Sequence, residues 1–236
     1  MLYLIDILDD PDHAFETVFK RFLEAENLEV DYQLLPGLNS VPTLSELRPR
    51  PSAVLISGSL QSVPDQKPWM LALEVLIREL HTQEIPIFGI CFGHQILASA
   101  LGGRVTNLPV WEFGEHAVYL QAEHPYLAGL SGRIQTLQVH QDHVAELPPG
   151  ATNLGLSAQT PHQIFAIGKS FGVQFHPEYT LEMLQTIIAA RHQRFVNKGP
   201  FQSQAHLQAI ARHWQLSQDA RQILLNFLNS LETSDV

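Results

Sequence analysis

Gly89-Ile90-Cys91-Phe92-Gly93-His94-Gln95 joins the apolar run Pro86–Ile90 to the helix-like segment Phe92–Leu101. The apolar run has the composition of a strand that is buried on both faces of a sheet. Gly102-Gly103 follows the second segment and is typical of a helix C-terminus. A short strand that leads directly into a helix predicts one unit of an α/β fold.

The chain before this segment repeats the same alternation of short apolar runs and amphipathic stretches. Strands are expected at Leu2–Leu8, Val30–Leu35 and Ala53–Ile56. A helix is expected to begin at Pro11-Asp12, and a second helix covers Trp69–Leu80. The apolar stripe of the first helix consists of Phe15, Val18, Phe19, Phe22 and Leu23. Strands that alternate with helices predict a mainly parallel central sheet flanked by helices.

The chain changes character after Arg104, where short runs are separated by turn residues. We expect these runs partly to extend the sheet and partly to form an antiparallel flap. They are Ala117–Leu120, Ile134–His140, Leu154–Ala158, Ile164–Ile167 and Gly172–Phe175.

The last part of the sequence predicts helices at Leu181–Phe195, Ser203–Trp214 and Ser217–Leu231. Ser203 and Ser217 are expected N-caps, and Asn197-Lys198-Gly199-Pro200 separates the first two helices. No stretch has the composition of a linker between domains. We therefore expect one domain over residues 1–236, in which residues 181–236 are the helical C-terminal part.

The composition excludes several classes of protein. The chain has 236 residues, of which 45% are apolar and 16% charged, as expected for a globular domain. The formal net charge of -10 and the lack of a basic cluster argue against nucleic acid as a partner. Met1–Asp6 lacks the features of a signal peptide, and no apolar run approaches the roughly 20 residues that span a bilayer. A cytoplasmic protein without a membrane partner is expected, and its oligomeric state is left open.

Cys91 lies at the expected turn between strand and helix, where a side chain projects above the sheet. Glycines on either side remove Cβ atoms that would collide in such a sharp turn. The helix N-terminus favours a thiolate, and the N–H group of Phe92 suits an oxyanion. A free cysteine is more often a small buried apolar residue, but the flanking glycines favour a nucleophile.

A candidate base follows a later strand, in Gly172-Val173-Gln174-Phe175-His176-Pro177-Glu178. His176 is expected at the carboxyl end of the sheet, where the active sites of α/β proteins gather. Glu178 can hydrogen-bond the imidazole and fix its tautomer. The alternatives are a surface histidine and an acid in the first turn of a helix.

A metal site is not expected. The His-x-Glu pattern of His176 and Glu178 also occurs in zinc deaminases, but those proteins need a Pro-Cys-x-x-Cys partner and this chain has one cysteine. His140, Asp142 and His143 stand too close together in sequence to converge on one ion without distant partners. We interpret His140 and Asp142 as pocket residues and expect His143 to face solvent.

Together these segments resemble the class I glutamine amidotransferases of the triad type. The pattern Gly-x-Cys-x-Gly-x-Gln, followed by a strand and His-Pro-Glu, is met by Gly89, Cys91, Gly93, Gln95 and His176-Pro177-Glu178. Three further segments resemble the oxyanion turn, a Glu-aromatic-Gly turn and a pocket segment of the family: Ser57-Gly58-Ser59, Glu112-Phe113-Gly114 and His140-Gln141-Asp142. The resemblance covers most of the chain and implies a flavodoxin-like fold.

The resemblance also implies the roles of residues. Cys91 would attack the side-chain amide of glutamine, His176 would act as base and then as acid, and Glu178 would orient His176. The N–H groups of Gly58 and Phe92 would bind the oxyanion. Residues expected to contact the substrate are Ser59, Gln95, His140, Gln141 and Asp142. No cofactor is implied.

Three functions remain open at this stage. The segments Thr180–Phe195 and Ile223–Leu228 most resemble the stand-alone subgroup related to the glutaminase domain of GMP synthase. Such a protein would hydrolyse glutamine, with a separate synthetase subunit as a possible partner. The second function is hydrolysis of γ-glutamyl peptides by the same triad. The third is a binding or redox-sensing module built on the elbow cysteine, which would not need His176 and Glu178.

Overall fold

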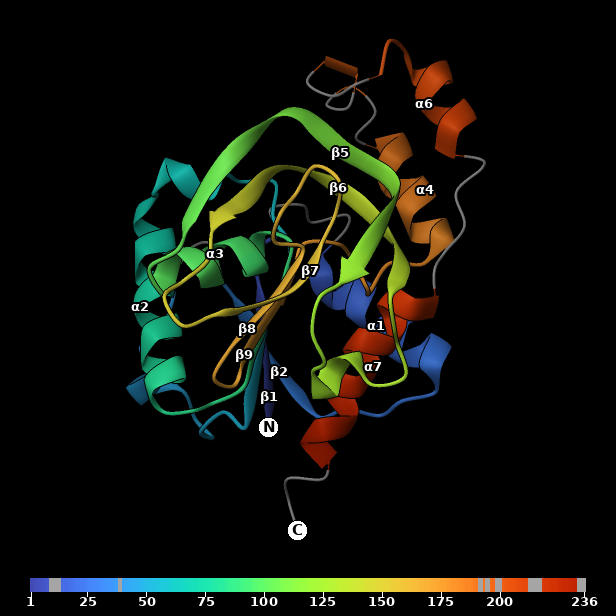
Figure 1. The fold of residues 1–236 in the computed structure, drawn as a ribbon. Helices are drawn as coiled ribbons and strands as arrows, with labels where there is room; N and C mark the ends of the chain where they lie inside the picture. The colour runs from blue at the N-terminus through green and yellow to red at the C-terminus, as the bar shows by residue number, and fades with distance from the viewer. Residues whose placement is uncertain are drawn as a thin grey trace.

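The computed structural model of the chain describes residues 1–8, 14–37, 40–190, 193, 196–197, 201–211 and 218–232. These residues contain one sheet of nine strands in the order β2-β1-β3-β4-β9-β8-β7-β5-β6. Figure 1 shows the sheet with helices packed around it. The expected α/β architecture with a central sheet is therefore confirmed.

Half of the sheet is parallel. β2 (Tyr32–Pro36), β1 (Leu2–Asp6), β3 (Ala53–Ile56), β4 (Ile87–Ile90) and β9 (Ser170–Val173) run in one direction. The helices α1 (Phe15–Glu26), α2 (Pro68–Thr82) and α3 (Phe92–Ala100) follow β1, β3 and β4. This is the crossover connection that parallel strands require. The first strand is two residues shorter than expected, and the start expected for the first helix lies outside the described residues.

The other half of the sheet is antiparallel and more extended than the sequence predicts. β5 (Arg104–Leu120) and β6 (Arg133–Glu146) form a long hairpin that curves over one end of the molecule (Figure 1). β7 (Thr152–Leu156) and β8 (Ile164–Ile167) join this hairpin to β9. Glu112-Phe113-Gly114 lies inside β5 rather than in a turn, which corrects that expectation. Gly114 has a φ of +93°, and the strand register shifts between Asn107 and Glu112, so the irregularity is contained in the strand.

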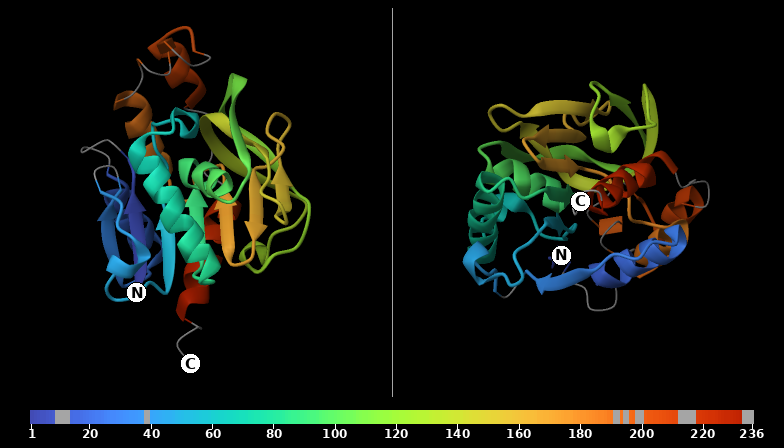
Figure 2. Two further views of the ribbon diagram at one scale, coloured as in Figure 1. Left: turned by 90° about the vertical axis from the view of Figure 1, so that its left-hand side faces the viewer. Right: turned by 90° about the horizontal axis from the view of Figure 1, so that it is seen from below.

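Helices cover both faces of the parallel half, as the views in Figure 2 show. α1 and α7 (Gln218–Glu232) pack on one face, and α2 and α3 pack on the other. Alternate residues of each strand enter the two cores, so Leu2 and Leu4 face α1 whereas Tyr3 and Ile5 face α2. Burial on both faces explains why these strands are apolar throughout.

The C-terminal helices within the described residues are α4 (Leu181–Ala190), α6 (Gln204–Ala211) and α7. The Ser203 hydroxyl accepts a hydrogen bond from the His206 N–H at 3.2 Å, which confirms the expected N-cap. Ser217, residues 198–200 and the expected ends at Phe195 and Trp214 lie outside the described residues. The described residues also include three short 3-10 helices, at Leu44–Glu46, Val63–Asp65 and Pro125–Leu127.

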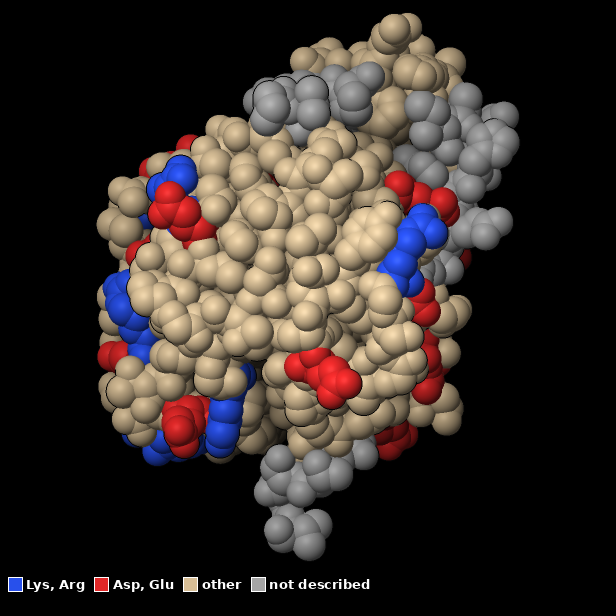
Figure 3. All heavy atoms as spheres, viewed as in Figure 1, with Lys and Arg blue, Asp and Glu red and all other residues tan. Residues whose placement is uncertain are grey.

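The outer face of the β5–β6 hairpin carries few charged side chains (Figure 3). On this face Lys and Arg lie scattered toward the margins and form no patch, so this face lacks the clustered positive charge with which proteins hold phosphate backbones. Within the described part of the chain, no helix is both long and apolar enough to cross a bilayer.

Candidate active site

A cavity of about 340 Å³ lies at the carboxyl ends of β3, β4 and β9. Gly58 follows β3, Cys91 follows β4, and His176 lies just beyond β9, and all three line the cavity. Adjacent parallel strands that end at one edge of a sheet therefore bring together residues that are far apart in sequence.

Cys91 occupies a strained turn between β4 and α3. Its φ of +51° and ψ of -103° are unfavourable for a residue with a side chain. The turn is closed by Gly89 and Gly93, because a Cβ on Gly89 would lie 2.5 Å from the Gly93 carbonyl and one on Gly93 would lie 2.3 Å from the Ile56 carbonyl oxygen. The Cys91 N–H donates to the Val173 carbonyl at 2.8 Å, which fixes the turn against β9. This geometry is that of a nucleophile elbow.

The turn Ser57-Gly58 holds the opposite side of the cavity. The Ser57 hydroxyl accepts from the Ile7 N–H at 2.9 Å, and the Ser57 carbonyl accepts from the Gly93 N–H at 3.1 Å. A Cβ on Gly58 would lie 2.9 Å from the Cε1 atom of His176 and 3.7 Å from the Cβ atom of Cys91. Gly58 is therefore required for the close approach of the turn to His176.

His176 and Glu178 form a buried pair. The Nδ1 atom of His176 lies 2.7 Å from Oε1 of Glu178, and the two side chains are 7% and 1% exposed. The ring of Tyr179 stacks on the His176 ring with centroids 4.2 Å apart. Burial opposes protonation of His176, but Tyr179, Glu178 and Cys91 together hold its pKa well above the ordinary value. Glu178 thus fixes the ring and favours its charged form.

The side chain and the backbone N–H of Phe92 lie in different surroundings. Its side chain is fully buried in the core between the sheet and α2, next to Trp69, and is not part of the cavity wall. Its backbone N–H belongs to the first residue of α3, and the first N–H groups of a helix have no partner within the helix. Of the two parts of Phe92, only the backbone N–H could bind an oxyanion next to Cys91.

Gln95 and Asp142 lie together on another wall of the cavity. The Gln95 amide donates to the backbone carbonyl of Asp142 at 2.8 Å and to Oε1 of Gln174 at 3.1 Å. The Asp142 carboxylate accepts hydrogen bonds from Ser62 and Asn107. Helix α3 and strand β6 are joined at this point.

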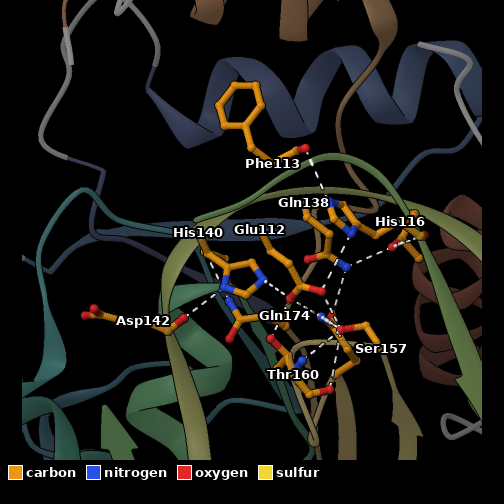
Figure 4. Close-up of polar contacts among 12 residues, drawn as sticks. Glu112, Phe113, His116, Gln138, His140, Asp142, Ser157, Thr160 and Gln174 are labelled. Carbon is orange, nitrogen blue, oxygen red and sulfur yellow. Dashed lines mark hydrogen bonds and ion pairs between the residues drawn. The ribbon is translucent and has the colours of Figure 1, made fainter. Parts of the chain in front are cut away.

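His140 connects this wall to a buried carboxylate (Figure 4). The Nδ1 atom of His140 lies 3.0 Å from the Asp142 carbonyl, and Nε2 lies 3.1 Å from Oε2 of Glu112. Ser157, Thr160 and Gln163 also donate to the Glu112 carboxylate. Although burial raises the pKa of Glu112, the hydrogen bonds from His140, Ser157 and Thr160 lower it to about 2. Glu112 is therefore ionised at neutral pH, and its charge stabilises the position of His140, which lines the cavity.

Ser59 and Gln141 also line the cavity, as expected. The Ser59 hydroxyl accepts from the N–H of Gln61 at 3.2 Å, and the Gln141 amide lies 3.4 Å from the Leu108 carbonyl. Nine of the ten residues selected from the sequence thus line this cavity, and Phe92 is the exception.

His143 does not face solvent, contrary to expectation. It is 8% exposed because β6 is paired along its length and packs on α3, and burial lowers its pKa. Among the residues with described positions, no group of three or more His, Cys, Asp or Glu side chains is arranged to hold a metal ion.

Sequence reasoning missed three side chains at the site. The Gln174 amide lies 3.6 Å from the Cys91 sulfur, Tyr179 covers His176, and Glu112 supports His140. A signal for Gln174 is present in the sequence, since it is the one polar residue of the expected strand Gly172–Phe175. Glu112 is expected from the sequence only as part of a turn.

Comparisons with known proteins point to one family. The model of the family "Glutamine amidotransferase class-I" matches residues 13–193. The glutamine-hydrolyzing GMP synthases of Thermomicrobium roseum and Thermus thermophilus are 32% identical over 187 residues and 35% identical over 154 residues. These matches cover 77% and 61% of this chain but 33% and 28% of the relatives, so the chain spans about a third of the length of the curated relatives it matches.

Solved structures show the same fold. A glutamine amidotransferase from Thermotoga maritima has a TM-score of 0.75 at 22% identity, and the match covers 98% of this chain and 96% of that protein. A glutamine amidotransferase from Methylobacillus flagellatus has a TM-score of 0.71 at 22% identity, with 97% and 93% covered. Because the family model matches residues 13–193 and the curated relatives match most of the chain, the chain belongs to the class-I glutamine amidotransferase family.

Proposed function

We propose that this chain hydrolyses the γ-amide bond of glutamine through a covalent intermediate on Cys91. The observation that carries the proposal is the strained elbow of Cys91 beside the His176–Glu178 pair, whose two side chains are 2.7 Å apart in the same cavity. A positive φ at a non-glycine residue costs free energy, so its retention at a cavity is a sign of function. The names of the relatives, glutamine-hydrolyzing enzymes, support the choice of substrate.

The reaction proceeds in two halves. The Cys91 thiolate attacks the amide carbon, the carbon–nitrogen bond breaks, and His176 gives a proton to the departing ammonia. A water molecule then loses a proton to His176 and cleaves the γ-glutamyl thioester, which releases glutamate and the thiolate. Glu178 holds the His176 ring in one orientation throughout.

The N–H groups of Gly58 and Phe92 stabilise the oxyanion of both tetrahedral intermediates. One such donor contributes roughly 3 kcal/mol to lowering the barrier. Gln95 and Asp142, which lie together on one wall of the cavity, bind the amino and carboxylate groups of the substrate. The synthetase reaction in the names of the relatives is not part of this proposal, because the chain matches about a third of their length.

The test is glutamate release from glutamine by the purified chain and by Cys91→Ala. We expect turnover that the substitution abolishes, and covalent labelling of Cys91 by a glutamine-mimicking electrophile. His176→Gln distinguishes catalysis from sensing. A catalytic cysteine should lose turnover in this variant. A sensor cysteine would keep its reactivity toward a small alkylating agent in the variant, and the parent chain would show no turnover. Full glutamine hydrolysis by Cys91→Ala would refute the proposal.

A further inference from the structure

The cavity next to Cys91 has two chemically different walls. The wall formed by Gln95, Asn107 and Asp142 is polar and is joined by hydrogen bonds between α3, β5 and β6. A second wall is apolar and consists of side chains from α1, β6 and α4. Its members are Val18, Val139, Leu184 and Ile187.

The apolar wall begins at His176. Tyr179 stacks on the His176 ring, and it belongs to one packed cluster with Val18, Leu184 and Ile187. Val139 packs against this cluster from β6. The ring that handles the proton is therefore at the border between the reacting atoms and the apolar surface.

The chemistry decides which part of a substrate meets this wall. His176 must reach the leaving nitrogen to protonate it, so the group on that nitrogen lies on the His176 side of Cys91. The glutamyl amino and carboxylate groups find hydrogen-bond partners on the polar wall. When glutamine is the substrate, the leaving group is ammonia, which carries no carbon and gains nothing from an apolar surface.

We infer that the apolar wall is a subsite for the leaving group, and that the chain cleaves γ-glutamyl amides of apolar amines in preference to glutamine. The inference rests on the proposed function, since it uses the same Cys91 thioester. The thiolate forms the bond to the γ-carbon, the carbon–nitrogen bond breaks, and the amine leaves with the proton of His176. Water then hydrolyses the thioester to glutamate, so the step needs no other reactant.

The experiment compares kcat/KM for glutamine with that for γ-glutamyl methylamide, propylamide and pentylamide. Each methylene that reaches the wall should raise kcat/KM by about fourfold, as expected for burial of one CH2 group. The γ-glutamyl amide of ethanolamine is the matched control, because it equals the propylamide in length but ends in a hydroxyl group. It should be hydrolysed several-fold more slowly than the propylamide.

Two variants locate the effect in the wall. Val139→Thr replaces a half-buried methyl group of the wall by a hydroxyl group and should reduce the gain per methylene. Val105→Thr is the matched control, because Val105 is a half-buried valine of the neighbouring strand β5 that does not line the cavity. It should leave the chain-length series unchanged.

The outcomes separate this inference from the proposed function. Hydrolysis of glutamine with a flat or falling chain-length series would overturn the inference and leave the proposed function intact. Equal effects of Val139→Thr and Val105→Thr would overturn it as well. Absence of turnover on every substrate, glutamine included, together with unlabelled Cys91, would contradict the proposed function and the inference with it.

Discussion

Gly58 sets the distance between the turn after β3 and the His176 ring. Its hydrogen atom points to a space that a methyl group would fill, 2.9 Å from Cε1 of His176. The backbone of Gly58 itself does not require glycine, since its φ lies outside the left-handed region. The requirement is therefore one of space at the reacting groups.

Gly58→Ala should lower kcat/KM by about a hundredfold, because displacement of a reacting group by roughly 1 Å has an effect of this size. The melting temperature should change little, as the new methyl group meets a side chain rather than backbone. Steady-state kinetics and a thermal melt check both parts. Unchanged kinetics would contradict a role of Gly58 in setting the position of His176.

Glu178→Gln should lower the pKa of His176, because the carboxylate is one of the groups that raise it. Because the pKa of His176 is raised in the folded state, its pairing with Glu178 stabilises the folded state fully below pH ~6.5. This contribution is lost as the pH rises through the folded pKa. An NMR titration of the imidazole signals measures the shift. Glu182→Gln, at an exposed position on α4, is the control and should leave the pKa of His176 unchanged.

At the scale of the elements, the β5–β6 hairpin carries both a cavity wall and its support. The register places Glu112 opposite His140, and β7 and β8 bring Ser157 and Gln163 to the same carboxylate. A charge buried to this extent is stable only while its partners stay in place. The network thus ties β5, β6 and the adjoining ends of β7 and β8 to one point next to the cavity.

Glu112→Gln should lower the free energy of unfolding by about 3 kcal/mol at pH 7, because the donors around the site lose a charged acceptor. The folded pKa of about 2 is below the unfolded value, so the carboxylate stabilises the parent above pH ~4.5 and less as the pH falls toward ~2. The variant should lack this acid-dependent loss. Urea denaturation at several pH values checks it, with Glu123→Gln at an exposed position as the control.

The sequence predicts Cys91 and His176 from their close neighbours, whereas it does not predict a contact made by strand pairing, such as that of Glu112 with His140. Cys91 was found because its glycines are neighbours in the chain, and His176 because Glu178 is two residues away. The role of Glu112 depends on its register with His140, 28 residues along the chain, and no local pattern encodes that pairing. The lengths of β5 and β6 were underestimated for the same reason, since polar residues on a hairpin do not produce an apolar run.

At the scale of the whole molecule, α7 joins the C-terminal part to the first strands. Phe227 is fully buried, with its ring 4.9 Å from that of Phe88 on β4 and 5.5 Å from that of Tyr126. Arg221 forms an ion pair with Glu26 of α1. We propose on this basis that residues 1–236 form a single domain in which the C-terminal helix is part of the main core.

Phe227→Ala should lower the free energy of unfolding by about 3–5 kcal/mol, the usual effect of removing a buried aromatic ring. Unfolding should remain one transition, with circular dichroism and intrinsic fluorescence changing together in urea. Glutamine hydrolysis at low temperature should stay close to that of the parent, because Phe227 does not line the cavity. Two separate transitions would indicate that α7 folds apart from the sheet.

The strand order of the sheet also bears on how such a protein can evolve. Cys91 and His176 follow β4 and β9, which pair directly, whereas Asp142, Gln141 and His140 lie on β6, at the far end of the antiparallel half. On the proposed function, bond cleavage is inherited with the parallel strands and part of the substrate choice with the hairpin. Lineages can therefore exchange or remodel residues 104–146 to acquire new substrates while the chemistry passes unchanged from ancestor to descendant.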